Sequence, residues 1–237
     1  MKNKVINLLL LLNISIYVFG QDSNEKPHAD RFFVSNGDTV WYSSIFTWKH
    51  SDVNWLRNSR THLLALVDSN LNVLTEFKYE RFCPFYGNGG AVMRNGRWGV
   101  VNKKGEEVID FKYTMFPFPF IDTTSNKEYY IFTKENKVGV IDLDGNTIIP
   151  FKWDEIRYLN YAILELRRGQ SCYLYFMKTG EKNAIKKDMI ICREFDDYGK
   201  TIVRDLELNK YGIMDTSCTI IQPCIYNSFK EVRKLLK

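Results

Sequence analysis

The chain has 237 residues, of which 45% are hydrophobic, 15% aromatic and 26% charged, and its formal net charge is +5. This composition is typical of a folded globular protein and excludes a disordered one, which would combine few aromatics with a high net charge. The excess lysines are scattered among predicted turns and form no basic stripe, so nucleic-acid binding is not expected.

Residues 1–20 have the pattern of a secretory signal peptide. Lys2 and Lys4 precede an apolar stretch from Val5 to Phe19, and Gly20 is a small residue at the expected cleavage point. The stretch is shorter than the roughly 20 apolar residues that a membrane-spanning helix needs. We therefore expect export to the periplasm or the cell exterior, with no transmembrane segment left after cleavage.

Residues 21–60 are predicted to form an N-terminal tail and an aromatic-rich hairpin. The hairpin has Phe32–Val34 and Thr39–Tyr42 on either side of the turn pair Asn36-Gly37. Arrays of repeats need such a cap at an exposed end. The alternative is an exposed platform for a glycan or peptide, made of Trp41, Tyr42, Trp48 and Trp55.

Between residues 61 and 230 a short phrase centred on glycine recurs, and a second box begins twelve residues after the glycine. The phrase contains Trp98-Gly99, Val138-Gly139 and Tyr211-Gly212, and the boxes are Phe111-Lys112-Tyr113, Phe151-Lys152-Trp153 and Cys224-Ile225-Tyr226. Degenerate copies, the first and the fourth, have Ala65 and Leu174 at the glycine position. Five copies at spacings of 34 to 40 residues indicate a repeat architecture.

Each copy is predicted to be a three-stranded antiparallel meander. Around Gly99 the strands are Ala91–Arg94, Arg97–Val101 and Glu107–Ile109, and the turns between them contain glycine. We therefore expect an all-β chain whose meanders form an open or solenoid-like array. A closed β-propeller is the alternative, although it needs four-stranded blades of about 40–45 residues.

The recurring residues have a structural explanation. A glycine inside a strand marks a place where another backbone or a ring comes close. We expect a large ring that lies over this bare backbone position to lock each module to its successor. The residues assigned to this structural role are Trp98, Gly99, Gly139, Tyr211, Gly212, Phe111 and Phe151.

The phrase Gly-Arg-Trp-Gly-Val, followed by Lys-Lys-Gly-Glu-Glu-Val-Ile, resembles the WG repeat, also called the KWG repeat. This is a bacterial repeat found in tandem, largely in proteins of unassigned function. The resemblance spans residues 61–230 and is strongest at 95–120 and 135–160. The copy around Leu174 departs from the pattern. The resemblance implies no catalytic residues.

Motifs for chemistry are weak in this sequence. The five cysteines are expected to be mostly buried free thiols, with Cys172 and Cys192 the first pair to test for a disulfide. Asp142–Gly145 resembles the start of a calcium loop but stands where the other copies have a hairpin turn. Gly87–Gly90 lacks the Lys-Ser/Thr of a phosphate-binding loop. No catalytic, metal-binding or cofactor-binding residue is predicted.

These observations favour an exported, non-enzymatic repeat scaffold that binds an envelope protein or a glycan. The alternative is a carbohydrate-binding or carbohydrate-processing protein that uses the N-terminal aromatics. Residues 231–237 are predicted to be a charged C-terminal tail.

Overall fold

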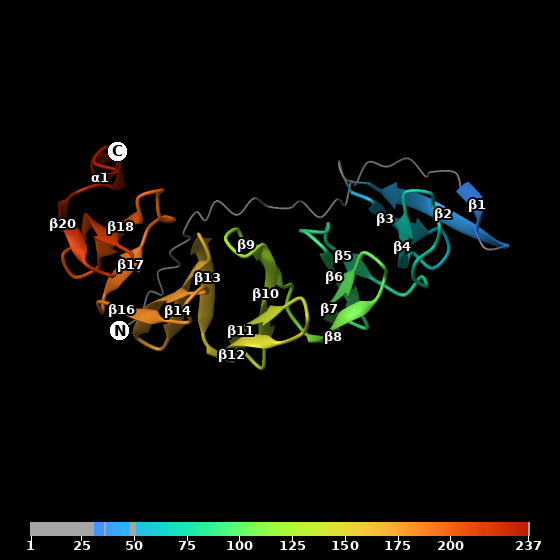
Figure 1. The fold of residues 1–237 in the computed structure, drawn as a ribbon, viewed down its shortest axis with the longest axis horizontal. Helices are drawn as coiled ribbons and strands as arrows, with labels where there is room; N and C mark the ends of the chain where they lie inside the picture. The colour runs from blue at the N-terminus through green and yellow to red at the C-terminus, as the bar shows by residue number, and fades with distance from the viewer. Residues whose placement is uncertain (1–30, 36, 48–50, 237) are drawn as a thin grey trace, which may run out of the picture.

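The computed structural model describes residues 31–35, 37–47 and 51–236 of the chain. The described part is nearly all β, with twenty strands in five antiparallel sheets of four strands and one short helix. The five sheets, called modules 1 to 5 here, follow one another along an open arc (Figure 1). The all-β prediction and the open array of antiparallel meanders are therefore confirmed. The predicted signal peptide and Trp48 lie outside the described residues.

In every module the strands follow chain order. Module 1 contains β1 (Arg31–Ser35), β2 (Asp38–Phe46), β3 (Val53–Asn58) and β4 (Leu64–Asp68). Module 2 contains β5 (Arg81–Phe82), β6 (Gly89–Arg94), β7 (Arg97–Asn102) and β8 (Glu107–Tyr113). Module 3 contains β9 (Phe118–Asp122), β10 (Lys127–Lys134), β11 (Lys137–Asp142) and β12 (Thr147–Trp153). Module 4 contains β13 (Glu155–Asn160), β14 (Ile163–Arg168), β15 (Ser171–Phe176) and β16 (Lys182–Ile185). Module 5 contains β17 (Met189–Ile191), β18 (Lys200–Asp205), β19 (Lys210–Asp215) and β20 (Ile220–Tyr226), and α1 (Phe229–Arg233) follows it.

The modules have four strands rather than the three predicted for each repeat. In modules 2 to 5 the strand that the sequence pattern missed is the first of the sheet, which precedes the three predicted strands. In module 1 the first two strands are those of the predicted hairpin. β5 and β17 are only two and three residues long, and β9 contains Pro119. Proline is tolerated in β9 because this strand lies at the edge of its sheet and pairs only with β10.

The apolar cores lie between neighbouring modules. Trp55 of module 1 packs in one cluster with Val92 of module 2, and Trp98 of module 2 packs in another with Phe132 of module 3. The boundaries between modules 3 and 4 and between modules 4 and 5 have equivalent clusters. Each module is thus stabilised mainly by its neighbours, as in other repeat proteins.

The first, degenerate copy is visible in the pairing register. Isolated bridges join Leu64 to Tyr79 and Val67 to Val73, at the same offsets from Ala65 as the pairs Trp98–Tyr113 and Val101–Glu107 have from Gly99. Residues 73–79 are therefore the counterpart of β8. The predicted capping hairpin, β1 and β2, is hydrogen-bonded to β3 and so extends the first sheet rather than forming a separate unit.

The recurring glycine is required by a close approach within its own module. A Cβ on Gly99 would lie 2.6 Å from the carbonyl oxygen of Ile109 and 2.9 Å from the Phe111 ring. Gly139 meets Ile149 and Phe151 in the same way. The expectation that the ring over the glycine comes from the neighbouring module was wrong, because an irregularity in the register of the last strand folds that strand's own ring onto the glycine.

Leu174 fits at the glycine position of module 4 because this module lacks the irregularity. β15 and β16 pair residue for residue, from Cys172 with Ile185 to Tyr175 with Lys182. No carbonyl or ring is folded onto the position, and the leucine side chain is fully buried between modules 4 and 5. Leucine can therefore replace glycine at this position because β15 and β16 pair without a register shift.

The ends of the array are closed differently. Ser228 caps the N-terminus of α1, and Val232 of this helix is fully buried against Ile202 and Ile213 of module 5. The predicted C-terminal tail is therefore partly a packed cap. At the other end, β1 leaves Phe32 and Val34 largely exposed. Among the described residues, no helix is long and apolar enough to cross a bilayer.

Candidate functional site

The most distinctive surface feature is a basic cleft between modules 3 and 4. It has a volume of about 340 Å³ and is formed by the end of β12 in module 3 together with the β14–β15 hairpin and β16 in module 4. Its lining residues, which define the term "basic cleft" below, are Lys152, Trp153, Arg168, Ser171, Tyr173 and Lys182.

Two aromatic rings form the base of the basic cleft. Trp153 is 5% exposed, and its ring centroid lies 5.8 Å from that of Tyr173 in an edge-to-face arrangement. The Lys182 ammonium lies 5.0 Å from the Tyr173 centroid, and that of Lys152 lies 5.6 Å from the Trp153 centroid. Cation–π attraction thus holds both lysines over the rings. The indole nitrogen of Trp153 is buried without a hydrogen-bond partner among the described residues.

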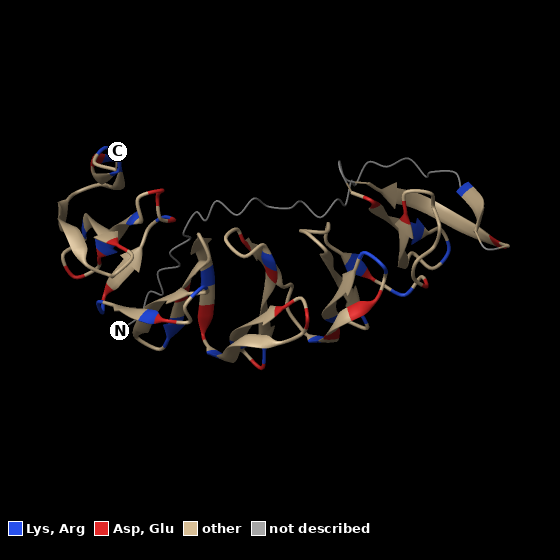
Figure 2. Ribbon diagram, viewed as in Figure 1, with Lys and Arg blue, Asp and Glu red and all other residues tan. Residues whose placement is uncertain are grey.

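The basic cleft has no carboxylate in its lining. Within the described part of the chain, neither Lys152 nor Lys182 forms an ion pair. The pKa of Asp154 is lowered mainly by hydrogen bonds that its carboxylate accepts from Lys137 and from the Gly169 amide, and the positive charge of Arg168 contributes less. The Asp154 carboxylate is therefore already bound by groups outside the basic cleft. Three cations therefore line the basic cleft together with no carboxylate, whereas charges of both signs are interspersed over the rest of the arc (Figure 2).

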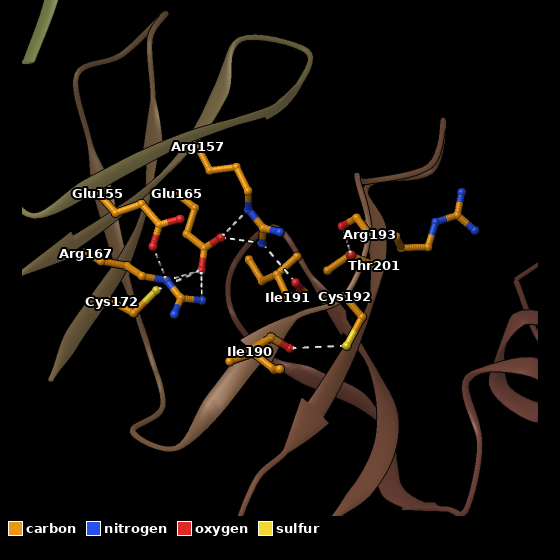
Figure 3. A network of polar contacts seen from close by, with 10 residues as sticks. All are labelled: Glu155, Arg157, Glu165, Arg167, Cys172, Ile190, Ile191, Cys192, Arg193 and Thr201. Atoms are coloured by element: carbon orange, nitrogen blue, oxygen red, sulfur yellow. Dashed lines mark hydrogen bonds and ion pairs between the residues drawn. The ribbon is translucent and has the colours of Figure 1, made fainter. Parts of the chain in front are cut away.

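A buried polar network fixes the hairpin that carries half of the basic cleft (Figure 3). Glu165 in β14 is 1% exposed and accepts hydrogen bonds from Arg157 Nε at 2.8 Å and from Arg167 Nη2 at 2.6 Å. Arg157 also donates to the Ile191 carbonyl oxygen of module 5 at 2.9 Å. The network therefore ties the β14–β15 hairpin to the next module.

Glu165 stands where the other modules have an apolar residue. It pairs with Leu174 at the glycine position, and the corresponding residues in modules 2, 3 and 5 are the fully buried Val92, Phe132 and Val203. Module 4 thus differs from the other repeats at two paired core positions. The sequence shows Leu174 at the glycine position of this degenerate copy, but only the strand register shows that Glu165 is its partner.

The cysteines are not arranged for nucleophilic chemistry. All five are free thiols in this structure, including the candidate pair Cys172 and Cys192. Burial raises the pKa of Cys83 and of Cys172 to about 12, and Glu165 accepts a hydrogen bond from Cys172. At neutral pH these groups are thiols rather than the reactive thiolates.

The predicted N-terminal aromatic platform is not a single surface. Trp55 is fully buried in the core between modules 1 and 2, so its assignment to the platform was wrong. Trp41 and Tyr42 are half-buried on β2 against Phe32 and Phe33, and consecutive strand residues point to opposite faces. These two rings cannot form one platform together.

The loop Gly87–Gly90 binds a carboxylate of the same chain, that of Glu128. The Glu128 carboxylate of β10 accepts hydrogen bonds from the amides of Asn88 and Gly89, and a Cβ on Gly87 would lie 1.7 Å from a carboxylate oxygen. The glycines are explained by this contact between modules 2 and 3. Similarly, the loop at Asp142 is a hairpin turn in which the aspartate accepts a hydrogen bond from the Asn146 amide at 2.7 Å.

Part of the repeat region matches a known protein family. Residues 98–137 and 139–162 match the family model described as the WG containing repeat; the first match runs from β7 to β10 and the second from β11 through β13. No curated protein matches the chain.

Several solved structures are similar in shape. A eukaryotic initiation factor has a TM-score of 0.48 at 12% identity, with 85% of this chain and 63% of that chain covered. Hsv2 of Kluyveromyces lactis has a TM-score of 0.39 at 10% identity, with 76% and 64% covered. Virginiamycin B lyase of Staphylococcus aureus has a TM-score of 0.37 at 13% identity, with 76% and 69% covered. These scores are too low to carry a functional argument.

Proposed function

We propose that this chain, which carries WG repeats within residues 98–162, is an exported, non-enzymatic interaction scaffold that binds an anionic ligand in the basic cleft. The observation that carries the proposal is the meeting of Lys152, Arg168 and Lys182 around Trp153 without a carboxylate. Like charges this close repel one another, and a bound anion would relieve the repulsion.

The lining favours a ligand with carboxylate or phosphate groups. A guanidinium such as that of Arg168 can bind either group with two parallel hydrogen bonds, and the Ser171 hydroxyl supplies a further donor. The cation–π contacts with Trp153 and Tyr173 restrain the lysine side chains, which reduces the freedom they would lose on binding. Open repeat arrays present broad surfaces, which supports a role in binding rather than in catalysis.

Calorimetric titration tests this proposal with two probes, inorganic pyrophosphate and trigalacturonate. We expect at least one probe to bind, with an affinity that falls as salt rises, and the double variant K152Q/K182Q to bind at least tenfold more weakly. The matched control is K112Q, because Lys112 occupies the same strand position but is ion-paired with Asp110 at 3.0 Å. Lack of binding by both probes, or an equal loss in K112Q, would overturn the proposal.

Export is tested separately, with the full chain produced in a bacterial host. We expect the protein outside the cytoplasm, with Gln21 as its first residue by mass spectrometry. A cytoplasmic product that retains residues 1–20 would contradict export without affecting the proposal for the basic cleft.

A further inference from the structure

We infer that a second binding site, on the turns of modules 3 to 5, takes a neutral oligosaccharide. The site is a groove of about 370 Å³, and it shares no residue with the basic cleft. Its volume lies within the range of small-molecule sites. The inference does not depend on anion binding.

The groove is built from four turns. They follow β9, β13, β15 and β19, so three consecutive modules contribute to it. Ile163 is buried in its floor, and Phe176 and Met177 are half-buried beside it. Hydroxyl and amide side chains surround this apolar floor, namely Thr124, Tyr161, Thr179, Asn183, Thr216 and Ser217.

Some of these polar groups are free to bind a ligand. The amide nitrogen of Asn183 donates to the Thr216 carbonyl oxygen at 3.1 Å, which fixes the side chain. The Asn183 amide oxygen and the Thr216 hydroxyl have no hydrogen-bond partner within the described residues. One acceptor and one group that both donates and accepts are therefore available.

The charges of the lining cancel. Lys178 and Glu181 are its only charged residues, and both are exposed. An anionic or cationic ligand would meet no net attraction, in contrast to the basic cleft. Hydroxyl-rich ligands with apolar faces match the alternation of free polar groups and an apolar floor, because a site that hydrogen-bonds hydroxyls rejects ligands that lack them.

Tyr161 completes the groove. Its side chain is exposed, and its hydroxyl donates to Asp197 in the loop between β17 and β18, which links the turns of modules 4 and 5. Its backbone has a φ of 48°, a region that few residues other than glycine, asparagine and aspartate enter readily. A tyrosine ring held in this way offers an apolar surface for the C–H face of a sugar.

The test follows the methyl signals of methionine and isoleucine by NMR while maltotriose, cellotriose or chitotriose is added to the full chain. We expect saturable shifts for Met177 and Ile163 with at least one trisaccharide. Met115, exposed on the connector between modules 2 and 3, should not shift. Trialanine serves as a neutral peptide for comparison.

The variant Y161N removes the ring but suits the positive φ, and it should weaken binding at least tenfold. The matched control Y198N removes an exposed tyrosine that does not line the groove and should leave the affinity within twofold. If Y161N fails to fold, T216V takes its place, with the same tenfold loss expected. K152Q/K182Q should bind the trisaccharide normally, which separates the two sites.

Absence of a saturable Met177 shift with all three trisaccharides would overturn the inference. So would a shift with trialanine alone, or equal losses in Y161N and Y198N.

Discussion

The boundary between modules 1 and 2 and the boundary between modules 3 and 4 differ in charge at equivalent positions. At the first, Lys78 lies 2.9 Å from Glu107, which also pairs with Arg94 at 2.6 Å. At the second, Lys152 takes the place of Lys78, and Lys182 takes the place of Glu107 at the start of the last strand. The first boundary neutralises its cations internally, whereas at the second neither lysine has an ion-pair partner among the described residues.

The buried aromatic position that stacks the modules is common to both boundaries, whereas the charged residues around it differ. The aromatic residue after each of these lysines is buried at both boundaries, as Tyr79 and as Trp153, and also as Tyr113 in module 2. The lysine lies over its ring in all three cases. The charges around the lysine can therefore change without disturbing the core, and a repeat array can acquire a binding site at one boundary alone.

The largest expected effect concerns the buried aromatic position that the module boundaries have in common, which Tyr113 occupies in module 2. Tyr113 is 2% exposed and stacks on Phe132 with 4.0 Å between ring centroids. We expect Y113A to lower the free energy of unfolding by about 3–5 kcal/mol, as for other large aromatic residues truncated in a core. Urea unfolding measures this, with K112A as the neighbouring surface control. A loss of under 1 kcal/mol for Y113A would mean that the ring does not join the modules.

The next effect concerns the network behind the basic cleft. Replacing Glu165 by Ala leaves Arg157 and Arg167 without their buried partner, and both guanidinium groups are partly accessible to water. We expect a loss of about 2–3 kcal/mol, smaller than for a fully buried pair. Thermal unfolding measures it, and E155A is the control because Glu155 is exposed and 3.8 Å from Arg167. Equal losses in the two variants would contradict the proposed anchoring.

A smaller effect is expected from converting the first boundary into the second. In E107K, three cations replace the cluster that Lys78 and Arg94 form with Glu107, and we expect about 1 kcal/mol of destabilisation. Burial raises the pKa of Glu107, but hydrogen bonds from Lys78 and Arg94 outweigh it and the pKa is lowered. A lowered pKa contributes stability above the unfolded-state value, about 4.3, and loses it as pH falls.

Denaturant unfolding across pH checks this sign. The difference in stability between wild type and E107K should be largest at neutral pH and shrink below about pH 4, where Glu107 becomes protonated in both the folded and the unfolded chain. A difference that grows on acidification would contradict the ion-pair assignment. High salt should also shrink it, because the groups are partly exposed.

The smallest effect on stability is expected from the reverse change. K182E places a carboxylate next to Lys152, as at the first boundary, and should raise the free energy of unfolding by at most about 1 kcal/mol. The same variant should lose binding of the anionic probe, measured by calorimetry. Unchanged binding in K182E would remove Lys182 from the proposed site.

Local residue patterns were sufficient for much of the fold. The glycine phrase at Gly99, Gly139 and Gly212 and the box that begins at Phe111 located the repeats, because hairpin turns and alternating strands are encoded within a few residues. The degenerate copy at Ala65 was found in the same way and is present in the pairing register. Short or proline-containing first strands such as β9 were not predicted, because they are strands by virtue of their pairing partner and not of their composition.

The tertiary structure alone decided which residues meet. Trp55 and Trp41 have similar sequence surroundings, but the stacking of module 2 buries Trp55 completely. Lys152 and Lys182 belong to different copies, and only the contact between modules 3 and 4 brings both of them to the Trp153 ring. Sequence periodicity specifies what each module buries and exposes, whereas the charges that gather at a boundary depend on how two modules pack.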